Sequence, residues 1–245
     1  MYSFSLKYQT AENIPAPYAH AIEINGDFVQ NQENTDVSLS FELTYLDREG
    51  ATEEDLLEEG FSLNDDFSWK GTLPKIWSDV IYGNLKSANE LFIKVLEPHQ
   101  EFWQVTFDSK EFYPADTEGF KYLVEELQQA VYESAGREAP LKLTYLKNQS
   151  GENIEVQVTA SFAERKLRHA RTNLIDSKKD AKILPWEELN FILKNTFSGE
   201  FETQFAHATK PAHKGVFVNT GDELWYEVGK SLLIHPNKIL KVMKM

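Results

Sequence analysis

Two histidines, His207 and His213, lie close together in the segment FAHATKPAH and have the chemistry of metal ligands. A divalent transition metal in such a site takes two imidazoles and a carboxylate held on a rigid frame. The acidic residues that could complete the site after folding are Glu200, Glu202 and Asp222. Pro211 separates the histidines, and their spacing matches neither one helix face nor neighbouring strand positions. The alternatives are a metal site, which would support a metal-assisted hydrolase, and a loop with two solvated histidines.

The densest basic segment of the chain, 165–182, could bind phosphate. Its cations are Arg165, Lys166, Arg168, Arg171, Lys178, Lys179 and Lys182. Nucleic acid is one candidate ligand, but no aromatic residue lies between Phe162 and Trp186 to stack on bases. We therefore favour a basic loop or helix that docks on the acidic first half of the chain, or on that of a second copy.

Trp69 lies in the segment NDDFSWKG, outside any clear periodicity and shortly after Asp65 and Asp66. These three residues are candidates for contact with a protein partner, with the indole as an exposed anchor. The alternative is an indole that packs back onto the core. Neighbouring carboxylates such as Asp65 and Asp66 would serve acid–base chemistry only if one were buried, so a solvated acidic face is the expectation.

Sequence signatures of common enzymes are missing. The triplet Gly229-Lys230-Ser231 resembles the end of a phosphate-binding loop, but that loop needs a glycine where Leu224 stands. The apolar residues on both sides of the triplet predict a hairpin turn instead. The chain contains no G-x-G-x-x-G, G-x-S-x-G or H-E-x-x-H segment and no cysteine. Thiol catalysis and disulfides are thereby excluded, and we expect no cofactor.

The charge is distributed unevenly along the chain. The net charge is −14, and residues 1–139 contain 9 Lys plus Arg against 27 Asp plus Glu, which gives −18. Residues 140–245 contain 16 against 12, which gives +4. An acidic surface repels phosphate backbones and anionic membranes, so the expected partner is a protein, and a basic one. With no apolar span and no signal peptide in MYSFSLKYQT, the expected compartment is the cytoplasm.

The elements that must position these residues are mainly strands. Apolar residues alternate with polar ones in segments 2–8, 37–45, 103–107, 141–145 and 154–162, and more briefly in 91–95. Such alternation is typical of half-solvated antiparallel sheets, and the turn-rich segment NQSGEN predicts a hairpin. After Gly199 the pattern predicts further strands at 216–218, 224–228, 232–234 and 239–243.

Helices are predicted at four places. The longest spans about 116–135, with one apolar stripe, a cap at Asp116 or Thr117, and an end at Gly136. Shorter helices are predicted after Pro74, after Pro185, and from Thr52, where Asp55 completes a capping-box pattern. The fold class is therefore α+β, with mainly antiparallel sheets packed by one long and several short helices.

Two similar halves are a further hypothesis. Leu43-Thr44-Tyr45-Leu46 recurs as Leu143-Thr144-Tyr145-Leu146, and each copy is followed by a Leu-Pro pair before a tryptophan. The halves would be 1–139, which is acidic, and 140–245, which is mildly basic, although one continuous domain fits the same patterns. The function expected from all these features is a non-enzymatic interaction protein that presents an acidic surface to a basic protein. The alternatives are the metal-assisted hydrolase and nucleic-acid binding through 165–182.

Overall fold

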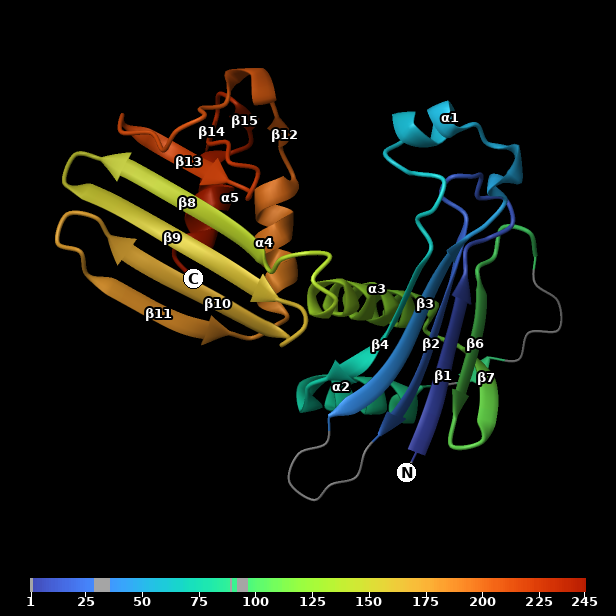
Figure 1. Ribbon diagram of the computed structural model, residues 1–245. Helices are drawn as coiled ribbons and strands as arrows, with labels where there is room; N and C mark the ends of the chain where they lie inside the picture. Colours follow the sequence, from blue (N-terminus) through green and yellow to red (C-terminus); the bar gives the residue numbers. More distant parts are fainter. Residues whose placement is uncertain (1, 29–35, 89, 92–96) are drawn as a thin grey trace. The chain divides into compact units, whose positions relative to one another are not determined.

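The computed structural model describes residues 2–28, 36–88, 90–91 and 97–245 (Figure 1). The chain divides into two compact units, Met1–Glu138 and Ala139–Met245. Within the described residues, no helix has the length and apolar composition needed to cross a membrane.

The first unit is built on a seven-stranded antiparallel sheet of order β4-β3-β2-β1-β6-β7-β5. Its strands are β1 (Tyr2–Gln9), β2 (His20–Phe28), β3 (Val37–Tyr45), β4 (Phe67–Leu73), β5 (Glu90–Leu91), β6 (Phe102–Phe107) and β7 (Lys110–Pro114). Its helices are the 3-10 turn η1 (Arg48–Gly50), α1 (Glu53–Glu58), α2 (Lys75–Ser87) and α3 (Thr117–Ser134).

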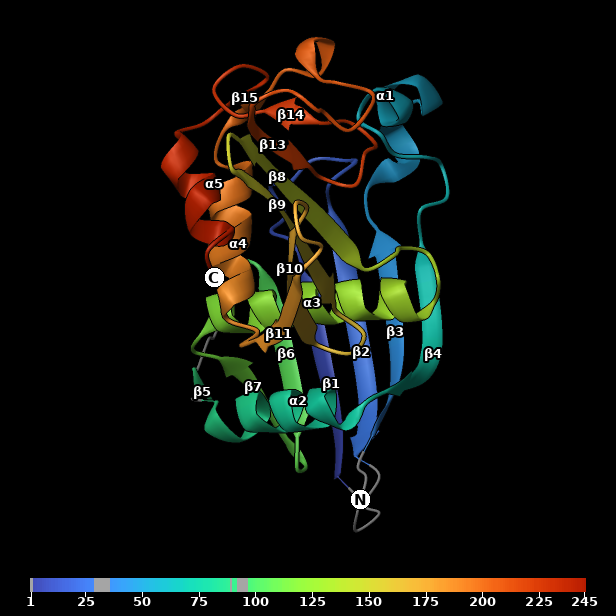
Figure 2. The same ribbon diagram turned by 90° about the vertical axis from the view of Figure 1, so that its left-hand side faces the viewer.

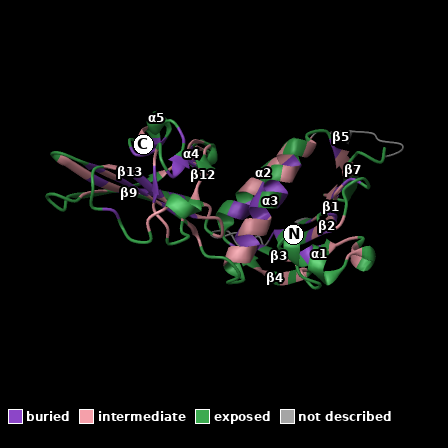
Figure 3. Ribbon diagram, turned by 90° about the horizontal axis from the view of Figure 1, so that it is seen from above, coloured by how far each residue is buried: buried purple, intermediate pink, exposed green. Residues whose placement is uncertain are grey.

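Helices α2 and α3 cover one face of this sheet (Figure 2). The Tyr82 ring of α2 packs 5.8 Å from Phe28, and the Phe120 ring of α3 lies 6.3 Å from Trp103. Strand residues alternate between buried and exposed, as a sheet covered on one side requires (Figure 3). The opposite face is polar and includes Ser38 and Ser40.

The second unit contains a six-stranded antiparallel sheet of order β11-β10-β9-β8-β13-β14. Its strands are β8 (Leu141–Gln149), β9 (Glu152–Ser161), β10 (Lys166–Asn173), β11 (Lys179–Leu184), β13 (Gly215–Asn219) and β14 (Tyr226–Glu227). A separate pair is formed by β12 (Glu200–Phe201) and β15 (Leu232–Leu233). The helices are α4 (Glu188–Phe197), η2 (Thr203–Phe205) and α5 (Pro236–Val242).

Helices α4 and α5 lie behind the six-stranded sheet in Figure 1 and enclose a core with it. This core includes Tyr145, Val158, Ile192 and Val242, each fully buried. Residues at alternate strand positions lie on the opposite face of the sheet. No helix of the second unit lies over β9 and β10 on this opposite face. The candidate site described below is on the same face.

The two sheets share most of their connectivity. In each unit the first strand, β1 or β8, pairs on one side with the first of three successive strands, β2–β4 or β9–β11. A helix follows, α2 or α4, and a later strand, β6 or β13, returns to the free side of the first strand. β7 and α3 complete the first unit, and β14, β15 and α5 complete the second. The first sheet also contains β5, which has no counterpart in the six-stranded sheet.

The recurring sequence elements fit this shared connectivity only in part. Leu73-Pro74 and Leu184-Pro185 occupy equivalent places, at the ends of β4 and β11 before α2 and α4. Leu43–Leu46 belongs to β3 and Leu143–Leu146 to β8, which are not equivalent strands. The two copies of the tetrapeptide therefore do not occupy equivalent positions in the two units.

The α+β class with antiparallel sheets is confirmed, and so is the long helix. Asp116 caps α3 by accepting a hydrogen bond of 2.9 Å from the Gly119 amide, and Gly136 follows the helix with φ 70°. The capping box of Thr52 and Asp55 starts α1. Of the strand predicted at 91–95, residues 92–95 lie outside the described residues.

Several local predictions were wrong. Residues 239–243 belong to helix α5 and its end, because Pro236 and the His235 cap start a helix in which Ile239, Val242 and Met243 share one face. Segment 165–182 is the hairpin β10–β11 rather than a loop or helix, since Leu167 and His169 alternate into the core. The turn at Gly229 does not form a hairpin, because β15 pairs with β12 and not with β14.

Candidate metal centre

The segment 206–214 carries both histidines and is tied to the sheet at two points. The backbone of His207 exchanges two hydrogen bonds of 2.9 Å with that of Trp225, just before β14. The Asn148 side chain of β8 donates to the carbonyls of Pro211, at 2.9 Å, and His213, at 3.2 Å. Both histidines therefore have fixed backbone positions although they lie outside regular strands.

Glu227 comes from β14 and faces the same side. It pairs with Phe217 of β13, and its neighbour Tyr226 points into the core beneath α4 and α5. The Glu227 amide donates to the Ser231 hydroxyl at 2.8 Å, and its carbonyl accepts from the amides of Lys230 and Ser231. Its side chain is only 11% exposed. The tight turn after β14 thus fixes the carboxylate at the sheet surface.

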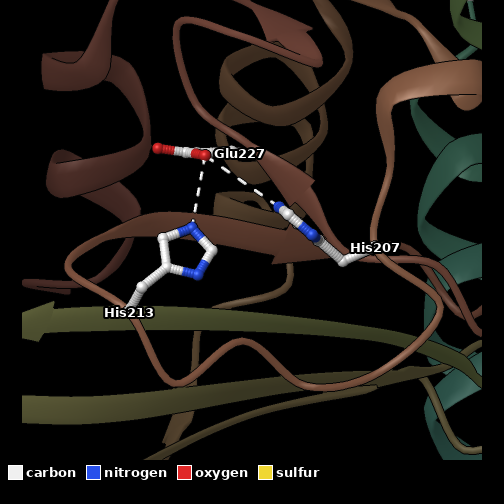
Figure 4. A group of neighbouring side chains, drawn as sticks. All are labelled: His207, His213 and Glu227. Carbon is white, nitrogen blue, oxygen red and sulfur yellow. Dashed lines mark hydrogen bonds and ion pairs between the residues drawn. The ribbon is translucent and has the colours of Figure 1, made fainter.

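The three side chains converge (Figure 4). Glu227 Oε2 lies 3.5 Å from His213 Nε2 and 3.9 Å from His207 Nε2. One ligand atom from each residue falls within 4.8 Å of the other two. The imidazole centroids are 5.2 Å apart, and both rings contact the edge or face of Phe217. This is the only such cluster of three within the residues that the structure describes.

The two carboxylate oxygens of Glu227 have different partners. Oε2 faces the histidines, and Oε1 forms an ion pair with Lys230 Nζ at 2.8 Å. Burial raises the pKa of Glu227, but Lys230 and His213 outweigh it and hold the pKa below its ordinary value. Gly215 leaves room for this arrangement, since a Cβ there would lie 3.3 Å from Oε1 and 2.7 Å from the Phe217 ring. The carboxylate is therefore charged and directed at the imidazoles.

Two imidazoles and one carboxylate are a donor set suited to zinc and similar divalent ions. Tetrahedral ligands about 2.0–2.1 Å from an ion stand roughly 3.3 Å apart, so small side-chain rotations would bring these atoms to a common centre. The His207 and His213 side chains are 38% and 51% exposed, so they have room to rotate. An ion held there would keep at least one coordination position open to solvent.

The sequence prediction for this site is corrected in one respect. The carboxylate beside the histidines is Glu227, not Glu200, Glu202 or Asp222. Asp222 instead accepts a hydrogen bond of 2.6 Å from the Tyr226 hydroxyl. Glu227 was missed because 224–228 resembles an apolar strand, and only the alternation of Tyr226 inward with Glu227 outward could have indicated it.

The acidic and aromatic candidates of the first unit each have partners within the fold. Trp69 lies in β4 rather than in a loop, where it is half-buried with its ring against the backbone of Gly71. Asp65 forms an ion pair of 2.8 Å with Arg48, and Asp66 accepts a 2.8 Å hydrogen bond from the Tyr45 amide. Their role in binding a partner stays a prediction.

The basic candidates of the second unit are divided between the two faces of the sheet. Lys166 and Arg168 are exposed on the face away from α4 and α5. Arg171 lies on the opposite face, in register with Asp180. Arg165 occupies the turn before β10 with φ 46° and lies 5.4 Å from the Trp186 ring.

Comparison with known proteins finds no family model, no curated protein and no solved structure that matches this chain. The class of protein is therefore given by the fold alone: an α+β protein with two antiparallel-sheet units.

Proposed function

We propose that the second unit binds a divalent transition metal ion such as zinc through His207, His213 and Glu227. The observation that carries the proposal is the convergence of one ligand atom from each residue within 4.8 Å. The separate anchoring of each residue, by Trp225, Asn148 and Ser231, supports it because a rigid frame lowers the cost of assembling the ligands. Lys230 acts as a positioning residue that turns Oε2 toward the ion.

Isothermal titration of the chelator-treated full chain with Zn²⁺ tests this proposal. The expected result is one ion per chain, with at least a tenfold loss of affinity in H207A and in H213A. The matched control is H99A, which removes an exposed histidine of the first unit and should leave the affinity unchanged. Equal zinc affinity in the wild type and the H207A/H213A double variant would contradict the proposal.

Metal-assisted hydrolysis is the catalytic form of the same proposal. A coordination position left to water would support it, because a bound Zn²⁺ lowers the pKa of its water to about 7. The test is zinc- or manganese-dependent cleavage of an activated phosphodiester by the wild type and H99A, with loss of turnover in H213A. Turnover that persists in H213A would exclude this site as its source.

A second candidate function belongs to the first unit: binding of a basic protein through an acidic surface. The observation that favours it is the excess of 27 Asp plus Glu over 9 Lys plus Arg before residue 140. The exposed carboxylates of α1, Glu53, Glu54 and Glu58, contribute to it. Capture of a partner should then weaken strongly between low and high salt, because screening removes long-range attraction. Capture that is indifferent to salt would contradict this candidate.

We also infer that the two units arose by duplication of one unit. The shared order of strands and helices supports this, together with the equivalent places of Leu73-Pro74 and Leu184-Pro185. Alignment of related sequences, once collected, should match β1 with β8 and α2 with α4. An alignment that instead matches the two Leu-Thr-Tyr-Leu segments would contradict the inference.

A further inference from the structure

The face of the six-stranded sheet opposite α4 and α5 carries a set of exposed cations. Lys142 of β8, Thr159 of β9 and Arg168 of β10 are consecutive register partners, so they form a row across three strands. Lys166 stands two residues before Arg168 and points to the same side. Lys179 of β11 is on this face as well, in register with Thr172. We refer to Lys142, Lys166, Arg168 and Lys179 as the basic strip.

The cations of the basic strip are not neutralised by neighbouring carboxylates in the described parts of the chain. None of its four residues forms an ion pair within the part of the chain that the structure describes. Glu155 is the acidic residue of β9 on this face, and its carboxylate is paired with Lys210. Between the cations stand neutral hydrogen-bonding side chains, Thr144, Gln157 and Thr159. The strip is therefore a positive surface in a chain whose net charge is −14.

The metal centre lies on the same face of the same sheet. Glu227 pairs with Phe217, Phe217 with Leu146, and Leu146 with Glu155, so a single row leads from β14 to β9. Lys142 is two strands from Glu227 and four residues along β8 from Leu146. This places its Cα about 10 Å across and roughly 13 Å along the sheet from that of Glu227. One extended ligand could reach both.

From this juxtaposition we propose that the basic strip binds the sugar–phosphate backbone of a single-stranded nucleic acid, with a phosphate of the same strand at the open position of the metal centre. The strip itself is independent of the metal. Only the second contact rests on the proposed metal function.

Charge complementarity favours a phosphate-bearing ligand, because several unpaired cations beside neutral hydrogen-bond donors are the usual surroundings of a nucleic-acid backbone. No aromatic side chain of β8, β9, β10 or β11 points to this face, so bases have no ring to stack on. Recognition should therefore be independent of sequence. A single strand, unlike a rigid duplex, can bend to follow the face from Arg168 to Glu227.

Fluorescence anisotropy with a labelled 20-nucleotide poly-dT at low salt is the experiment, on the full chain without added metal. K142E/R168E should lower the affinity at least tenfold. The matched control K194E/K241E makes the same charge change on exposed lysines of α4 and α5, on the helical side, and should lower it less than threefold. The K142A/R168A variant should also reduce the slope of log affinity against log salt by about 1.4, the value for two lost phosphate contacts.

The proposal would be overturned by a wild type that does not bind at low salt, or by a control that is as damaging as K142E/R168E. Preference for a duplex of the same length would overturn the choice of a single strand. Self-association that K142E/R168E abolishes, without oligonucleotide binding, would assign the strip to the acidic half of a second copy and reject nucleic acid.

The same anisotropy measurement with added Zn²⁺ distinguishes the role of the basic strip from that of the metal centre. Zn²⁺ should raise the affinity of the wild type for the oligonucleotide at least threefold and leave that of H207A/H213A unchanged. If calorimetry shows that zinc binds but anisotropy does not respond to it, the phosphate contact at the ion is wrong. If zinc does not bind, the metal function fails and the strip is judged by K142E/R168E alone.

Discussion

The guanidinium of Arg48 lies against two aromatic rings, 3.9 Å from the centroid of Tyr45 and 5.2 Å from that of Phe61. It pairs with Asp65 at 2.8 Å and donates to the Ser62 carbonyl at 2.7 Å. Asp65 also accepts from the amide and the hydroxyl of Ser62. Asp65 was predicted to contact a protein partner, and in the structure it holds the loop before β4 in place.

Asp65 should therefore make a stability contribution that depends on pH. Burial raises the pKa of Asp65, but the hydrogen bonds from Ser62 and the charge of Arg48 outweigh it and hold the pKa below its ordinary value of 3.8. A carboxyl group whose pKa is lower in the folded state stabilises above its unfolded pKa, and that contribution is lost as the pH falls through the folded pKa.

We expect D65N to lower the free energy of unfolding by about 1–2 kcal/mol at pH 7. The difference from the wild type should shrink below about pH 4. Urea denaturation at pH 7 and pH 3 measures both values. The control is D79N, which breaks an exposed pair with Lys75 on α2 and should cost less than about 0.5 kcal/mol. A D65N deficit that is as large at pH 3 as at pH 7 would show that the charge of Asp65 is not its cause.

At the scale of elements, the middle of the first sheet depends on a strand residue without a side chain. Gly26 of β2 pairs with Phe4 of β1 and with Leu39 of β3, and all three lie on the face covered by helices. A Cβ at Gly26 would lie 2.5 Å from the Phe4 ring and 2.7 Å from Leu39 Cδ2. The absence of a side chain lets the Phe4 ring lie over the strand.

G26A should therefore destabilise the first unit by about 1–3 kcal/mol, because a buried ring must move to admit the methyl group. The matched control is G83A in α2, where a Cβ would meet nothing within 4 Å. That substitution should stabilise by up to about 1 kcal/mol, since alanine favours helix more than glycine does. Thermal unfolding of both variants measures the contrast. Equal effects of the two substitutions would reject the steric explanation.

At the scale of the whole molecule, each unit has a sheet and a core of its own. The buried core residues of the second unit run from Leu143 to Met243. Among the described residues, each strand pair lies within Met1–Glu138 or within Ala139–Met245. Both units are long enough for a cooperative domain.

Fragments 1–138 and 139–245 should therefore each fold alone, with circular dichroism of mixed α and β structure and one cooperative thermal transition apiece. Fragment 139–245 should also keep the zinc affinity of the full chain, because every proposed ligand lies within it. Loss of cooperative unfolding in either fragment would show that its core depends on the other unit.

The sequence by itself determined the elements whose signals are local. Alternation at Leu39, Phe41 and Leu43 indicated β3, and the caps at Thr52 and Asp116 placed the starts of α1 and α3. These patterns suffice because a strand face or a first helical turn involves residues a few positions apart. The α+β class followed from the same signals, because the apolar faces of alternating strands and striped helices are buried when helices pack on a sheet.

Tertiary structure alone decided which of these residues meet. Glu227 joins His207 and His213 because β14 pairs with β13 and because Trp225 and Asn148 fix the intervening segment, and none of those pairings has a local signal. The division of 165–182 between two faces likewise depends on the register of β10 with β9. A shift of one residue in that register would exchange the faces, so the register sets the place of the charges.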